Sequence, residues 1–266
     1  MSGRFAKGHI PDPEGHRVTS FRLAKVSGAD LPDAVDLTAF APSPLDQNRC
    51  GSCVGHATAG ALATAFARAS APLGFIPSPR SIYQLARCID RADSSVALTD
   101  GGSMPNQAMR SLTEWGIRPM QAPSPEGFNS DCDPSNVNNE PTLGELESDA
   151  TAVVVGQYAI DSAEQAATAI AEGFPVTVAS FVDTAFENIG PDSPPYDMPD
   201  ESDPNGGGHY IFLVGYRHVN GKLEFLLQNS WGTTQWGSGG RCWVTADFVN
   251  QCTDKYAMSV KARRLI

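Results

Sequence analysis

Cys53 is the residue most able to do chemistry in the stretch LDQNRCGSCVGHATAG, residues 45–60. Ser52 is a good N-cap, and the Ala-rich run 53–69 that follows predicts a largely buried helix. Cys53 would then lie in the first helical turn, where exposed backbone N–H groups stabilise a thiolate and lower the thiol pKa. A thiolate is the nucleophile that acyl transfer needs. The alternative is a buried structural cysteine, and this segment alone leaves both readings open.

Two other kinds of site use the same residues. Cys50 and Cys53 form a Cys-x-x-Cys pair, as in thiol–disulfide exchange proteins, but no strand precedes the pair as that motif normally requires. Cys50, Cys53 and His56 would also begin a zinc site, although a second closely spaced ligand pair is missing. We therefore expect no metal ion and no cofactor.

A cysteine nucleophile needs a histidine to pair with the thiolate and a third group to orient that histidine. Of the five histidines, His209 is the best candidate, because it stands between GGG and the apolar strand YIFLVGY. Of the other four, we place His9 and His16 in a polar N-terminal arm. We assign His56 to packing within the first helix and His218 to a solvated hairpin turn.

The hairpin register indicates the third group. Asn220-Gly221 suits a two-residue turn between the strands YIFLVGYR and KLEFLLQN. Strands paired across that turn would place His209 opposite residue 232 and Asn229 opposite residue 212. Both side chains then lie at the same end of the hairpin, where the Asn229 amide would orient the imidazole and Trp231 would shield the polar pair from water.

The rest of the chain supplies elements that would position these residues. Periodicity and turn signals predict helices first and strands later, so we expect an α+β protein with a cleft between two unlike halves. The helical half covers about 45–150 and the β-rich half about 151–266. Expected helices are 53–69, one starting at Ser78-Pro79, about 104–115, and 161–173; expected strands are 151–160, 174–182, 210–217, 222–229, 241–249 and 256–265.

Composition limits the partners. The chain has 266 residues and a formal net charge of −11, which argues against nucleic acid, since phosphate binding needs a basic face. No window has the apolar length of a membrane helix, and the N-terminus lacks the apolar core of a secretory signal. We therefore expect a monomer that contacts neither nucleic acid nor membrane. Its location stays open between the cytoplasm and export by a non-Sec route.

At this point the sequence resembles the papain-like cysteine peptidases over roughly residues 31–264. Four ordered blocks carry the resemblance, and LPDAVDL at 31–37 looks like the start of the mature family domain. The blocks are QNRCGSC at 47–53, DGG at 100–102, GHYIFLVGY at 208–216 and LQNSWGTTQWGSGG at 227–240. The resemblance implies the papain-like two-lobe fold, with a helical lobe, an antiparallel sheet or barrel lobe and the active-site cleft between them.

The resemblance also implies roles. Cys53 would be the nucleophile, His209 its base, Asn229 the residue that orients His209, and Gln47 the oxyanion-hole donor. Substrate would be a protein or peptide, and the pocket residues suggest a medium apolar P2 side chain. The implied substrate-binding residues are Gly101, Gly102, Ser103, Met104, Ala179, Gly208, Tyr210 and Trp231.

Several positions depart from the family pattern. Val54 replaces the usual Trp after the nucleophile, and His56 replaces an aromatic residue. Relatives bond the equivalent of Cys50 to a cysteine where this chain has Thr99, so Cys50 would be free or pair elsewhere. Cys88 and Cys132 resemble the family's second bridge. Residues 1–30 are too few for the usual helical propeptide and read as a short arm or pro-segment before the domain at 31–266.

These features predict a cysteine endopeptidase. Two alternatives remain: a catalytically weak papain-like binding or inhibitory module, motivated by Val54, and a transacylase on the same machinery. If residues 1–30 lie over the cleft, they would restrain activity. The loop 187–208 holds six acidic residues, which form either a solvated loop or a rim that attracts basic substrates: Glu187, Asp192, Asp197, Asp200, Glu201 and Asp203.

Overall fold

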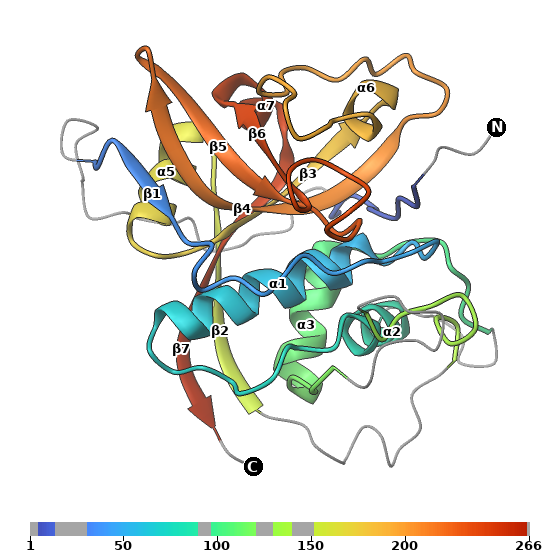
Figure 1. Ribbon diagram of the computed structural model, residues 1–266. Helices are drawn as coiled ribbons and strands as arrows, with labels where there is room; N and C mark the ends of the chain where they lie inside the picture. The colour runs from blue at the N-terminus through green and yellow to red at the C-terminus, as the bar shows by residue number, and fades with distance from the viewer. Residues whose placement is uncertain (1–4, 14–30, 90–96, 121–129, 140–151, 265–266) are drawn as a thin grey trace.

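The computed structural model describes residues 5–13, 31–89, 97–120, 130–139 and 152–264 (Figure 1). Three helices from the first half lie together below most of the sheet in Figure 1. They are α1 (Cys53–Arg68), α2 (Pro79–Ile89) and α3 (Pro105–Trp115). The predicted helices 53–69, 78 onward and 104–115 are thus confirmed to within a residue or two.

The second half forms an antiparallel sheet with order β2-β7-β3-β4-β5-β6, and the short strand β1 (Ala34–Asp36) pairs with β4. Its strands are β2 (Ala152–Ala159), β3 (Val176–Val182), β4 (Gly207–Val219), β5 (Lys222–Gln228), β6 (Arg241–Thr245) and β7 (Thr253–Arg264). Helices α5 (Ala163–Ala171), α6 (Thr184–Glu187) and α7 (Ala246–Gln251) belong to the same half. The α+β prediction is confirmed, with an open sheet rather than a closed barrel in the described residues.

Two details of the strand prediction were wrong. The stretch 246–249, expected as strand, begins α7, because Thr245 caps a helix there and accepts a hydrogen bond from the Phe248 N–H. Residues 34–36 join the sheet although they precede the helical half, so the chain crosses between the halves before α1 begins.

Helix α1 is buried nearly all round, which explains its small residues. At Gly60, an added Cβ would lie 2.7 Å from the Phe212 ring of β4, so the helix could not approach the sheet with any side chain there. Leu62 and Phe66 of α1 share a core with Leu112 of α3 and Phe212. This packing fixes the N-terminus of α1 against β4, and those two elements carry the candidate nucleophile and base.

A second core holds the sheet half together. It joins α5 and α7 to strands β3, β4 and β5, and its largest buried side chains include Phe186, Trp231, Trp236 and Phe248. Trp236 donates its Nε1–H to the Phe186 carbonyl at 2.7 Å, which satisfies a buried donor. The loops around the cleft therefore rest on a rigid aromatic layer.

Candidate active site

Cys53 is the first residue of α1, as predicted, and is fully buried. Ser52 stands at the N-cap, but its side chain makes no cap hydrogen bond and its Oγ lies 3.2 Å from His56 Nδ1 instead. The Cys53 sulfur is contacted by the backbone N–H groups of Tyr210, Gly8 and Val54, which favour a thiolate. Burial outweighs them and raises the thiol pKa to about 11, opposite to the direction predicted from the helix terminus.

His209 lies on β4 with its ring buried and fixed on two sides. Its Nε2 is 2.8 Å from Asn229 Oδ1, and its ring stacks on Trp231 with centroids 4.7 Å apart. Asn229 Oδ1 also accepts the Ser230 N–H at 2.8 Å, so Oδ1 is an acceptor and the His209 Nε2 carries the proton. In the neutral ring Nδ1 is then the basic nitrogen, and it has no hydrogen-bond partner among the described residues.

The environment keeps His209 neutral. Burial lowers the imidazole pKa to about 3, electrostatic interactions led by the one with Lys7 lower it further, and the Asn229 hydrogen bond opposes them. The Cys53 thiol and the His209 imidazole are therefore both neutral near neutral pH, whereas nucleophilic attack by a cysteine needs the thiolate.

The hairpin register brings His209 and Asn229 together by a different pairing from the one predicted. Val219 faces Lys222 as expected, but a bulge between Leu213 and Gly215 shifts the ladder, so that Phe212 faces Gln228 rather than Asn229. The ladder ends there, and no residue 232 stands opposite His209. Asn229 instead leaves the strand end, from which its amide reaches the ring.

Gln47 is buried just before α1, and its side-chain amide is held in a fixed orientation. Its Oε1 accepts the Ser230 hydroxyl at 2.5 Å, while its Nε2 donates to the Cys50 carbonyl at 2.8 Å and to the Ala6 carbonyl at 3.2 Å. The amide N–H groups thus donate to backbone carbonyls, one of which, that of Ala6, belongs to the N-terminal segment 5–13. Ser230 thus positions Gln47, a role that the sequence did not predict. Its place directly after Asn229 is the one feature of the sequence that could have pointed to it.

Residues 5–13, called the arm from here on, run along the junction of the helical and sheet halves (dark blue in Figure 1). Ser103 N–H donates to the Gly8 carbonyl at 2.9 Å, the Ile10 N–H to the Ser103 carbonyl at 3.0 Å, and the His9 N–H to the Gly208 carbonyl at 3.2 Å. The arm therefore forms backbone hydrogen bonds with both walls of the cleft.

Side chains of the arm add three further contacts. Phe5 stacks on Trp231 with centroids 4.2 Å apart and planes within 6° of parallel. Lys7 forms a buried ion pair with Glu187 and also donates to the Asn205 carbonyl at 2.8 Å. His9 Nε2 lies 2.8 Å from Asp254 Oδ2. The sequence did not indicate that Glu187 would form an ion pair with the arm, nor that Asp254 would contact it.

The predicted substrate-binding residues are only partly gathered at the arm. Ser103, Gly208, Tyr210 and Trp231 contact it directly, and the Ala179 backbone pairs with Tyr210 in the sheet. Gly102 lies so close to the arm that a Cβ built on it would be 2.4 Å from the Gly8 carbonyl oxygen, but its N–H donates to Tyr83 Oη at 3.0 Å and not to the arm. Gly101 is exposed, and Met104 caps α3.

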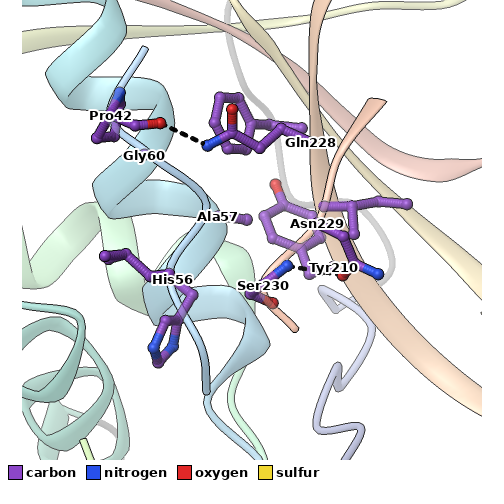
Figure 2. Close-up of a pocket in the computed structure, with 11 residues that line it drawn as sticks. Pro42, His56, Ala57, Gly60, Tyr210, Gln228, Asn229 and Ser230 are labelled. Atoms are coloured by element: carbon purple, nitrogen blue, oxygen red, sulfur yellow. Dashed lines mark hydrogen bonds between the residues drawn. The ribbon is translucent and has the colours of Figure 1, made fainter. Parts of the chain in front are cut away.

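A pocket beside this site lies between α1 and the β4–β5 strands (Figure 2). His56, Ala57 and Gly60 line one side of it, and Tyr210, Gln228 and Asn229 line the other. Gln228 Nε2 closes one end by donating to the Pro42 carbonyl at 3.0 Å. The pocket lining does not include Cys53 or His209.

His56 packs within the protein, as the sequence indicated. Its Nδ1 is 3.0 Å from the Ser52 carbonyl and its Nε2 is 2.8 Å from Ser130 Oγ, so both ring nitrogens are engaged away from Cys50 and Cys53. Within the described ranges no group of three or more His, Cys, Asp or Glu side chains is arranged to hold a metal ion. The same residues include no helix with the length and apolarity to span a bilayer.

The cysteines are all reduced, and their arrangement differs from the one implied by resemblance. The buried thiols of Cys50 and Cys132 hydrogen-bond to each other, and this contact is the main cause that raises the Cys50 pKa. They share a small core with Tyr83 and Val137, which excludes the partly exposed Cys88. Cys132 therefore has Cys50 as its neighbour for bridging.

Oxidised glutathione should link Cys50 to Cys132, because those thiols already touch. The two thiols would lose two electrons and two protons to the reagent. Closing this long loop would stabilise the chain by up to about 4 kcal/mol and raise Tm by several degrees. Peptide mapping with Cys88→Ser as the control identifies the bridge, and a Cys88–Cys132 link would contradict the geometry.

Comparison with known proteins places this chain in a family. The family model for "Papain family cysteine protease" matches residues 31–262, which is most of the chain. The chain belongs to the papain family. Cathepsin L of Sarcophaga peregrina is 27% identical over 208 residues, covering 78% of this chain, which spans only 56% of that relative's length.

Solved structures of the papain family show the same fold. Xylellain, a cysteine protease from Xylella fastidiosa, superposes with a TM-score of 0.74 at 23% identity and covers 98% of both chains. Procathepsin L 3 from Tenebrio molitor larval midgut gives a TM-score of 0.65 at 19% identity, covering 97% of this chain and 76% of that one. The two-lobe papain-like fold predicted from the sequence blocks is thus confirmed.

Proposed function

We propose that this papain-family chain hydrolyses peptide bonds, with Cys53 as nucleophile and His209 as its base. The observation that carries the proposal is the tautomer of His209: Asn229 holds the proton on Nε2 and leaves Nδ1 free to accept a proton, on the residue next to Tyr210, whose N–H contacts the Cys53 sulfur. Membership of the family supports a peptide substrate.

The proposed reaction uses residues of this chain alone. The Cys53 thiol transfers its proton to His209 Nδ1, and the thiolate attacks the carbonyl carbon of the scissile bond. The Gln47 side-chain N–H and the Cys53 backbone N–H stabilise the oxyanion, each worth roughly 10²–10³ in rate in comparable sites. His209 then protonates the leaving amine, and water hydrolyses the thioester. Trp231 shields the His209–Asn229 hydrogen bond by stacking on the ring.

We also propose that the arm keeps the enzyme latent. The Gly8 N–H points at the Cys53 sulfur, so the thiol meets a hydrogen-bond donor there rather than an electrophilic carbonyl carbon. The arm thereby occupies the substrate cleft without presenting a bond for attack. Burial under the arm also contributes to the neutral state of both Cys53 and His209.

Covalent labelling tests the proposal in the full chain. A peptidyl epoxide should add once to the variant Gly8→Val, in which the arm is displaced, and intact mass should show no adduct when Cys53→Ala is added. Labelling of another cysteine in place of Cys53 would refute the assignment of the nucleophile. Absence of any adduct would favour a papain-like binding module.

A further inference from the structure

The His9 side chain of the arm lies between the Asp254 carboxylate and the Tyr210 ring, and the space that it fills is called the recess from here on. Its Nε2 is 2.8 Å from Asp254 Oδ2, and its ring lies parallel to Tyr210, with 8° between planes and 5.8 Å between centroids. Both members of the contact are largely buried, with side chains 5% and 14% exposed. A flat cation fits between a carboxylate and an aromatic face of this kind.

Asp254 depends on the arm for its partners. Among the described residues, the carboxylate accepts hydrogen bonds from His9 Nε2 and from the Asp12 backbone N–H at 3.2 Å, and both belong to the arm. Lys255, the adjacent cation, points elsewhere, because its Nζ donates to the carbonyls of Asn250 and Cys252. Once the arm leaves, Asp254 retains none of these partners, and a largely buried carboxylate without a partner is unfavourable.

The backbone holds Asp254 in place for this contact. Its φ of 42° is in the left-handed region, a conformation that aspartate and asparagine adopt more readily than most residues. Its carbonyl accepts a hydrogen bond from Tyr210 Oη at 3.3 Å, so the residue is tied to the ring that forms the other wall of the recess. The carboxylate is thus presented in one orientation beside Tyr210.

We propose that Asp254 determines specificity by selecting a basic side chain, arginine above all, in the peptide substrate. The inference rests on the proposed peptidase function. The recess opens on the catalytic cleft, since His9 follows Gly8, the residue at Cys53, and its backbone bonds Gly208. A guanidinium would pair with the carboxylate through two parallel hydrogen bonds and stack on Tyr210, which an apolar side chain cannot do.

This selection differs from the medium apolar side chain expected from the resemblance. It also differs from attraction of basic substrates by the acidic loop 187–208, because most carboxylates of that loop accept hydrogen bonds within the protein. Asp203 accepts the Thr184 N–H, Asp197 accepts the Thr245 hydroxyl, and Glu201 accepts the Gln251 amide. Asp192 is exposed in that loop and offers a matched control for long-range charge.

The test uses sets of three peptides that differ at one residue, which is arginine, its neutral isostere citrulline, or leucine. One set is made for each position on the acyl side of the cleaved bond. In the full chain with Gly8→Val, kcat/KM for the best arginine peptide should exceed that for its citrulline partner by about 10- to 100-fold, as expected for a charged hydrogen bond. Asp254→Asn, which suits the same φ, should reduce that ratio to within about threefold. Asp192→Asn should leave the ratio in place.

Binding supplies a readout that does not need catalysis. The same peptides, carrying a fluorophore, are titrated by anisotropy against the full chain with Gly8→Val and Cys53→Ala. Preferential binding of the arginine peptide that Asp254→Asn abolishes would support the inference, even if no peptide were cleaved and the peptidase proposal failed. Equal binding and cleavage of the arginine and citrulline peptides, or a preference that survives Asp254→Asn, would overturn it.

Discussion

Replacing Gly8 with valine should raise peptide hydrolysis by the full chain about 100-fold or more. Any Cβ at position 8 would lie 1.9 Å from the Gly51 carbonyl oxygen and 2.6 Å from its Cα. Both are backbone atoms, which cannot move aside as the end of a flexible side chain can. The arm therefore cannot dock as it does now, and the cleft opens.

The size of the effect follows from how firmly the arm is held. Three backbone hydrogen bonds, a buried ion pair at Lys7, the contact between His9 and Asp254, and the stacking of Phe5 all favour the closed state. Apparent activity scales with the open fraction, so an arm docked in 99% or more of molecules lowers the rate by about 100-fold.

Pro11→Val is the matched control, because it introduces the same side chain at an exposed position of the arm. Initial rates on a fluorogenic peptide library, measured for the natural chain and both variants, decide the matter. Equal rates in all three chains would mean that the arm does not restrain activity, whereas a rise in Pro11→Val as well would point to loss of the arm by a route other than the Gly8 contact.

Cys53→Ala in the Gly8→Val chain should lower the rate of hydrolysis by at least about 10⁴-fold, as expected when a nucleophile is removed from a cooperating set. His209→Ala should have a comparable effect, because it removes the proposed acceptor of the thiol proton. The double variant should be hardly slower than either single one, since the two residues act as a unit.

Controls of the same residue types are available in exposed positions. Cys88→Ala removes a partly exposed thiol and His218→Ala an exposed imidazole, and neither should change the rate more than about twofold. Measuring kcat and KM separately shows whether chemistry or binding is lost. Retention of substantial activity in Cys53→Ala would assign the reaction to another group.

The elements that carry the proposed catalytic residues were predictable from local signals. Cys53 was placed by a helix-start signal, and His209 and Asn229 by a hairpin turn at Asn220-Gly221. These signals are local, and a helix cap or a two-residue turn fixes its neighbours by short-range geometry. The bulge between Leu213 and Gly215 was missed, because a one-residue bulge leaves little mark on an apolar strand.

Contacts made across long chain separations could not be predicted. The ion pair of Lys7 with Glu187, the contact of His9 with Asp254 and the neighbouring thiols of Cys50 and Cys132 all depend on the path of irregular segments. The direction of the Cys53 pKa shift was also mispredicted, because the burial of its thiol depends on such long-range contacts. Exposed helical N–H groups lower a thiol pKa, but burial beneath the arm dominates here.

The rate at which iodoacetamide alkylates Cys53 as a function of pH tests most directly whether Cys53 is a nucleophile masked by the arm. Alkylation needs the thiolate, so in the natural chain, where burial raises the pKa of Cys53 to about 11, it should stay slow at neutral pH and rise toward alkaline pH. In Gly8→Val the thiolate forms with His209, so alkylation should be fast and nearly independent of pH around neutrality. Identical pH profiles in the two chains would contradict masking of Cys53 by the arm. Activation by His209 would be contradicted if Gly8→Val showed the pH profile of an ordinary thiol and if adding His209→Ala left that profile unchanged.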